Sequence, residues 1–112
     1  MNRRQISIDR VKRLVVKVGS NVLTAPRGLN LRALRGIARQ IGGLMDRGLD
    51  VILVSSGAMA SGVKKIGLDR RPDELPRRQA VAAVGQAGLI MEYEKAFERH
   101  GRKVAQILLT SE

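Results

Sequence analysis

A lysine at the end of an apolar run is the residue of this sequence best suited to do chemistry. Lys17 interrupts the apolar run from Leu14 to Val18, and Gly19 and Ser20 follow it. Charged side chains are rarely tolerated within a buried apolar run unless a partner compensates them. An ammonium group here can contact phosphate oxygens, and a glycine lets the backbone approach such a ligand closely. Lys17 would then neutralise charge that builds on a transferred phosphoryl group and its leaving oxygen.

Lys17 also has a simpler interpretation, in which a lysine at the end of a strand reaches solvent. The phosphate-binding loop in which Gly-Lys is followed by Ser or Thr is absent, because the lysine here precedes the glycine. The sequence therefore excludes a P-loop protein and leaves both interpretations of Lys17 open.

A second segment of the same kind is Ser55-Ser56-Gly57-Ala58, which follows the apolar run Val51–Val54. Amide groups exposed at the start of a helix form an anion pocket, and serine hydroxyls add donors for a carboxylate or phosphate. The alternative is a serine that only caps the helix. A serine nucleophile is disfavoured, because the single histidine, His100, lies at the end of a distant predicted helix.

The elements that must position these two segments follow the order of a parallel α/β protein. Apolar runs predict buried strands, and the continuous run 14–18, rich in β-branched residues, is expected to be buried on both faces. Helical spacing of apolar residues predicts helices capped by Asn30 and ended by glycines. The expected strands are 14–18, 51–54 and 104–109, and the expected helices are about 31–47, 58–65 and 77–99. We expect a loop at 19–29 and a charged linker at 69–76. Because the carboxyl ends of parallel strands share one edge of the sheet, Lys17 and Ser56 should face the same cleft.

The segment Gly85-Gln86-Ala87-Gly88 lies within the long predicted helix. Two glycines inside a helix each cost about 1 kcal/mol relative to alanine. They indicate either the close approach of another backbone, a substrate or a subunit, or tight packing of the helix on the sheet.

Composition limits the remaining possibilities. The net charge is +11, aromatic residues make up 2%, and there is no cysteine. The charge favours polyanionic partners, yet the basic residues are scattered in pairs without interleaved aromatics, which argues against nucleic acid and for a solvated surface. The sequence shows neither a signal peptide nor a membrane span, so we expect a cytoplasmic protein. It also shows no cluster of metal ligands.

Several segments together resemble the amino acid kinase family. They are Leu14–Thr24 (LVVKVGSNVLT), Val51–Gly62 (VILVSSGAMASG), Arg78–Gln86 (RQAVAAVGQ) and Val104–Thr110 (VAQILLT). The first segment is shared widely across the family, whereas the combination of the second and third is closer to members that phosphorylate glutamate. The match covers nearly everything from about residue 13 onward.

The resemblance implies a three-layer α/β/α sandwich with a mainly parallel sheet, of which residues 1–112 are expected to be the amino-terminal portion. It implies ATP-dependent phosphorylation of the glutamate side-chain carboxylate, the first step of proline biosynthesis, with ATP and Mg²⁺ as cofactors and a homo-oligomeric enzyme. Lys17 would contact phosphate, with Gly19 and Ser20 lining the phosphate path. Ser56 would bind glutamate, with Gly57 and Ala58 forming the backbone around it.

The family's kinase domain is more than twice as long as this chain, and its later substrate-binding, lysine and adenine-binding segments have no counterpart here. We therefore expect the chain alone to be inactive. The alternatives are a related kinase that acts on another carboxylate, carbamate or phosphate, a small basic nucleic-acid-binding module, and a truncated product that folds only with its missing half.

Overall fold

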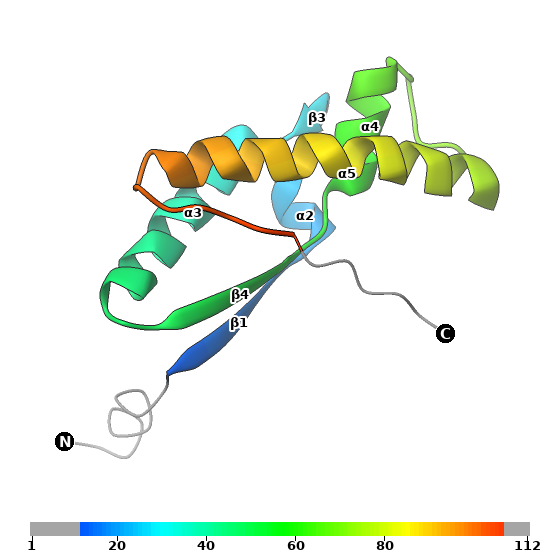
Figure 1. The fold of residues 1–112 in the computed structure, drawn as a ribbon. Coiled ribbons are helices and arrows are strands. Elements are labelled where there is room, and N and C mark those ends of the chain that lie inside the picture. The colour runs from blue at the N-terminus through cyan, green and yellow to red at the C-terminus, as the bar shows by residue number, and fades with distance from the viewer. Residues whose placement is uncertain (1–11, 107–112) are drawn as a thin grey trace.

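The structure, a computed structural model, describes residues 12–106 as an α/β fold (Figure 1). In chain order the elements are β1 (Arg13–Val18), α2 (Ser20–Leu23), β2 (Thr24–Ala25), β3 (Gly28–Leu29), α3 (Leu31–Asp46), β4 (Asp50–Ser55), α4 (Ala58–Ile66) and α5 (Leu75–Glu98). Strands β1 and β4 pair in parallel, and β2 and β3 pair as a small antiparallel hairpin. The predicted α/β class and its parallel strand pairing are confirmed.

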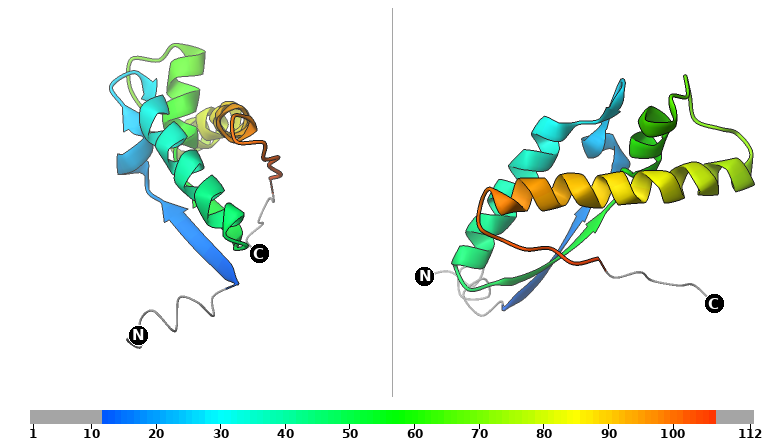
Figure 2. Two further views of the ribbon diagram at one scale, coloured as in Figure 1. Left: turned by 90° about the vertical axis from the view of Figure 1, so that its left-hand side faces the viewer. Right: turned by 45° about the horizontal axis from the view of Figure 1, so that its top comes forward.

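The helices of the described residues cover one face of the β1–β4 pair (Figures 1 and 2). Val16 and Leu53 pack against the core under α3 and α5. On the other face Val15 is 55% exposed, and Ile52 and Val54 are each 47% exposed. Our expectation that strand 14–18 is buried on both faces is therefore wrong for residues 12–106, because only one helical layer packs against the strand pair.

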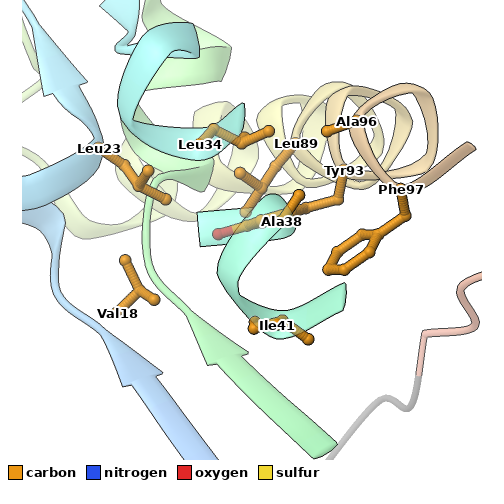
Figure 3. Close-up of a cluster of buried hydrophobic side chains, with 9 residues drawn as sticks. All are labelled: Val18, Leu23, Leu34, Ala38, Ile41, Leu89, Tyr93, Ala96 and Phe97. Carbon is orange, nitrogen blue, oxygen red and sulfur yellow. The ribbon is translucent and has the colours of Figure 1, made fainter. Parts of the chain in front are cut away.

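The core joins the sheet to α3 and α5 (Figure 3). Its buried members are Val18, Leu23, Leu34, Ala38, Ile41, Leu89, Tyr93, Ala96 and Phe97. Although aromatic residues are scarce, both of them lie here, and the ring centroids of Tyr93 and Phe97 are 6.3 Å apart. Burying each of the larger side chains contributes about 1.5–3 kcal/mol to stability, so this cluster holds α5 across the sheet.

Helix α3 begins where the sequence predicts. The side chain of Asn30 accepts a hydrogen bond of 3.1 Å from the amide of Ala33, which satisfies a donor at the helix start. Leu34, Ala38 and Ile41 recur at helical spacing and are buried. The short helix α4 also matches its prediction, ending at Gly67 with a φ of 84°.

The segment predicted as a loop between residues 19 and 29 contains a helical turn and a hairpin instead. Leu23 at the end of α2 is fully buried and anchors the segment to the core. Gly28 has a φ of 107°, a backbone conformation that favours glycine, and it begins the second strand of the hairpin. Local turn residues were visible in the sequence, but the buried position of Leu23 depends on tertiary packing.

The carboxyl-terminal prediction differs from the structure in two respects. Helix α5 starts at Leu75 rather than at residue 77, because a proline in the first helical turn lacks only a donor that has no intrahelical partner. Residues 104–106 of the strand predicted at 104–109 are not a strand. The apolar residues 107–109, which produced that expectation, lie outside the described residues.

Helices α4 and α5 cross at two glycines, one on each helix. A Cβ atom added to Gly85 of α5 would overlap the carbonyl of Ala58, and one added to Gly62 of α4 would lie 2.8 Å from the carbonyl carbon of Val81. Both glycines are buried. Of the alternatives that the sequence left open for Gly85, the close approach of another backbone is the one observed, and that backbone belongs to α4.

We expect Gly85→Ala to lower the free energy of unfolding by about 2 kcal/mol or more, because backbone atoms cannot move aside as a flexible side chain can. Gly43→Ala in α3 is the matched control, since its added Cβ would meet nothing within 4 Å. That control should raise the free energy of unfolding by roughly 0.5–1 kcal/mol. Urea unfolding followed by circular dichroism measures both, and equal effects would contradict the proposed crossing contact.

Candidate functional site

The two segments singled out in the sequence meet at one edge of the parallel strand pair. Lys17 is in register with Val54 and Val18 with Ser55. The amide of Ser56 donates a hydrogen bond of 2.9 Å to the carbonyl oxygen of Val18, which extends the pairing past the strand ends. The two strand tips lie side by side as predicted, but neither Lys17 nor Ser56 lines either of the two hollows described in this part of the chain. The expected common cleft and the chemical roles of the residues stay predictions.

Lys17 lies on the open face of the sheet. Residues alternate between the faces of a strand, so Lys17 shares a face with the exposed Val15, while Val16 and Val18 point into the core. Among residues 12–106, no carboxylate forms an ion pair with Lys17. Its side chain is therefore exposed, as in the simpler of the two interpretations that the sequence left open, and it is available to an anion.

Gly19 and Ser20 follow the tip of β1 and start the one-turn helix α2. Gly19 is the N-cap residue with a φ of −79°, and its carbonyl accepts a hydrogen bond of 3.1 Å from Val22. This backbone conformation is open to any residue. What distinguishes the position is free space, because a Cβ atom added there would meet nothing within 4 Å.

The two serines at the end of β4 have different surroundings. Ser55 is half-buried, and its hydroxyl donates to the carbonyl of Ser56 at 2.8 Å and lies 2.7 Å from the Tyr93 hydroxyl. The single proton of the Ser55 hydroxyl can turn to either acceptor, so either hydroxyl can be the donor in the bond between Ser55 and Tyr93. Ser55 is thus occupied within the fold, whereas Ser56 is exposed.

Helix α4 begins at Ala58 after a glycine, and Ser56 does not cap it. Gly57 is the N-cap residue, with a φ of 119° and no side-chain cap hydrogen bond. A Cβ atom at Gly57 would lie 3.1 Å from Leu29, so both conformation and space favour glycine. The interpretation of this segment as a plain serine cap is wrong, and the amide groups at the start of α4 carry no side-chain acceptor.

Tyr93 is the residue of this region that sequence reasoning missed. It comes from α5, is only 3% exposed and joins Ser55 across 38 positions of sequence. Burial raises the pKa of the Tyr93 hydroxyl above its ordinary value, and the hydrogen bond to Ser55 lowers it in part. The helical spacing of Tyr93 indicated only a core residue and did not identify Ser55. The one available signal was general: the hydroxyl of a buried tyrosine usually has a hydrogen-bond partner.

The site is an open edge rather than a closed cavity. A hollow of about 320 Å³ lies nearby between β3, α4 and α5, but neither Lys17 nor Ser56 lines it. Within residues 12–106, no three His, Asp or Glu side chains gather as they would around a metal ion. In the same residues, no helix combines the length and apolar character needed to cross a membrane.

The amino-acid sequence is similar to that of a known protein family. The profile described as the amino acid kinase family matches residues 12–112. A protein of Thermus thermophilus named glutamate 5-kinase is 54% identical over 101 residues, which are 90% of this chain and 27% of that protein.

Two further relatives carry the same name. The protein of an Azoarcus species is 54% identical over 94% of this chain, and that of Clostridium acetobutylicum is 50% identical over 100%. These alignments cover 29% and 42% of the two relatives. The chain thus spans between about a quarter and two fifths of the length of the relatives it matches.

We expect the folded chain to lose stability as the pH rises above about 10, the ordinary pKa of tyrosine. Because the folded-state pKa is raised, the stabilising contribution of the neutral hydroxyl is complete below that pH and disappears as the pH passes through the folded-state pKa. Tyr93 is the single tyrosine, so near-ultraviolet absorbance reports its ionisation directly.

The tyrosinate midpoint should be higher in buffer than in concentrated urea. Tyr93→Phe should cost about 1 kcal/mol at neutral pH, the usual size of one hydrogen bond, and should reduce the loss of stability at high pH. Equal midpoints in buffer and urea would show that the hydroxyl is not buried.

Proposed function

Because the chain belongs to the amino acid kinase family, we propose that it is the amino-terminal portion of a kinase domain that phosphorylates glutamate. The reaction transfers the γ-phosphoryl group of ATP to the side-chain carboxylate of L-glutamate. A carboxylate oxygen bonds to the γ-phosphorus, the bond from that phosphorus to the β–γ bridging oxygen breaks, and ADP and glutamyl 5-phosphate result. This is the first step of proline biosynthesis.

One observation carries the proposal: Lys17 and Ser56 leave neighbouring strand tips at the same sheet edge, in a chain that is 54% identical to a protein named glutamate 5-kinase. Parallel α/β sheets bind ligands at the carboxyl ends of their strands. A phosphate donor near the first tip and a carboxylate acceptor near the second would therefore be neighbours, as direct transfer requires.

Lys17 acts electrostatically in this proposal. Its exposed ammonium group balances negative charge on the transferred phosphoryl group and on the departing bridging oxygen. Gly19 leaves space for phosphate oxygens beside the backbone, and the exposed hydroxyl of Ser20 supplies a further donor. These three residues line the path of the phosphates.

The glutamate carboxylate is held at the second tip. Ser56 offers its hydroxyl, and the backbone from Gly57 to Ala58 leads into the amide groups of α4, where the helix dipole favours negative charge. Tyr93 is a positioning residue, because its bond to Ser55 fixes the end of β4 immediately before Ser56.

ATP and Mg²⁺ enter the proposal differently. Lys17, Gly19 and Ser20 suit the phosphates of ATP, whereas the described residues offer no group of metal ligands. Mg²⁺ in kinase sites is held by one or two carboxylates together with substrate phosphates, and ATP itself would supply the phosphates. A cytoplasmic location and a homo-oligomeric state remain predictions.

The proposal is tested in a chimera in which residues 12–112 replace the matching segment of the Thermus thermophilus relative. Hydroxylamine traps the acyl phosphate, so hydroxamate formation measures the reaction. Lys17→Ala should lower kcat by about 10²–10³-fold, the usual effect of removing a group that stabilises developing charge. Ser56→Ala should mainly raise the KM for glutamate, by about tenfold or more for a lost hydrogen bond to a charged group.

Lys12→Ala is the matched control, because Lys12 is an exposed lysine at the opposite end of β1. It should leave both parameters within about twofold of the unsubstituted chimera. Unchanged kinetics in both Lys17→Ala and Ser56→Ala would overturn the proposal. Hydroxamate formation from another carboxylate at a higher kcat/KM than from glutamate would favour a related kinase instead.

A further inference from the structure

A second feature of the molecule, separate from the strand tips, is a strongly basic groove. It has a volume of about 650 Å³ and lies between α3 and the carboxyl end of α5. Its lining residues are Arg32, Arg35, Gly36, Arg39, Ala96, Arg99 and His100. None of them belongs to the proposed kinase site, and none of these described lining residues is acidic.

The arginines of α3 share one side of that helix. Arg32, Arg35 and Arg39 are spaced by three and four residues, so their side chains project in one direction. With a rise of about 1.5 Å per residue, they extend over about 10 Å. Arg99 joins them from the end of α5, which crosses α3 at this point (Figure 2).

These positive charges have no ion-pair partners among residues 12–106. The three ion pairs of that part of the chain join Arg77 to Glu74, Lys95 to Glu92 and Arg102 to Asp46. Four guanidinium groups that line one groove repel one another, and a bound anion would remove this repulsion. The groove is thus electrostatically complementary to a multiply charged anion.

We propose that this groove binds a small ligand carrying at least two phosphate groups, in addition to the proposed kinase function. Guanidinium groups match phosphate oxygens in a planar, bidentate geometry, and several of them within about 10 Å suit neighbouring phosphates. Single-stranded nucleic acid normally requires exposed aromatic side chains for stacking. Tyr93 and Phe97 are the chain's two aromatic residues and both are buried, so recognition here depends on phosphate.

Gly36 allows the groove to be closed without changing its charge. A Cβ atom added at Gly36 would meet nothing within 4 Å, and the residue lines the groove from the middle of α3. A leucine there would fill space that the ligand needs while retaining every arginine. Glycine is also a poor helix former, so the replacement favours the helix.

The test is isothermal titration of the whole chain with inorganic tripolyphosphate at low ionic strength. Saturable binding is expected, and the double variant Arg35→Gln/Arg39→Gln should weaken it by at least about tenfold. Gly36→Leu should also weaken binding severalfold. The matched control is Arg70→Gln/Arg71→Gln, which removes two exposed charges from the linker before α5 and should change the affinity by less than about twofold.

Tripolyphosphate can also bind at the proposed kinase site, so the groove and linker variants are compared in a Lys17→Ala background. In that background saturable binding should persist, because the groove arginines are unchanged. Loss of binding in Lys17→Ala with none in Arg35→Gln/Arg39→Gln would overturn the groove proposal and leave the kinase proposal standing. Equal losses in the groove and linker double variants would show diffuse charge attraction instead. The proposal is also overturned if no saturable binding occurs, or if a single-stranded RNA binds the same arginines more tightly than tripolyphosphate.

Discussion

The parallel pairing of β1 with β4 is the interaction on which the rest of this structure depends. It runs from Arg13 opposite Asp50 to Val18 opposite Ser55, and one more hydrogen bond, from the Ser56 amide to Val18, continues it beyond the strands. A slip of β1 by one residue would turn Lys17 toward the core and Val18 toward solvent. The buried cluster around Val18 opposes that slip, so hydrophobic packing sets the direction in which a charged side chain points.

Helix α5 braces the site through two contacts of different kinds. Near its middle, Gly85 allows the backbone of α4 to approach, which fixes where the first amide groups of that helix lie. Two turns later, Tyr93 bonds to Ser55 and holds the end of β4. One contact requires the absence of a side chain and the other requires a hydroxyl. Together they define the position of Ser56 without touching it.

Local features of this fold could be predicted from sequence, whereas features that depend on packing could not. The cap at Asn30 and the helix end at Gly67 follow from residue type, and both are as predicted. The continuous apolar run of β1 indicated burial on both faces. That prediction failed because an apolar run does not reveal how many layers cover it. The Tyr93–Ser55 bond joins residues 38 positions apart and depends on where α5 crosses the sheet. In the same way, the spacing of the arginines on α3 was visible, but their proximity to Arg99 was not.

The exposed sheet face has a consequence for the chemistry proposed at Lys17. That lysine stands among Val15, Ile52 and Val54, all of which are about half exposed. Any layer that came to rest on these aliphatic side chains would also expel water from around the ammonium group. Coulomb attraction strengthens as the effective dielectric constant falls, so the same apolar association would intensify the pull of Lys17 on a phosphate. Hydrophobic assembly and electrostatic activation would then be a single event at this surface.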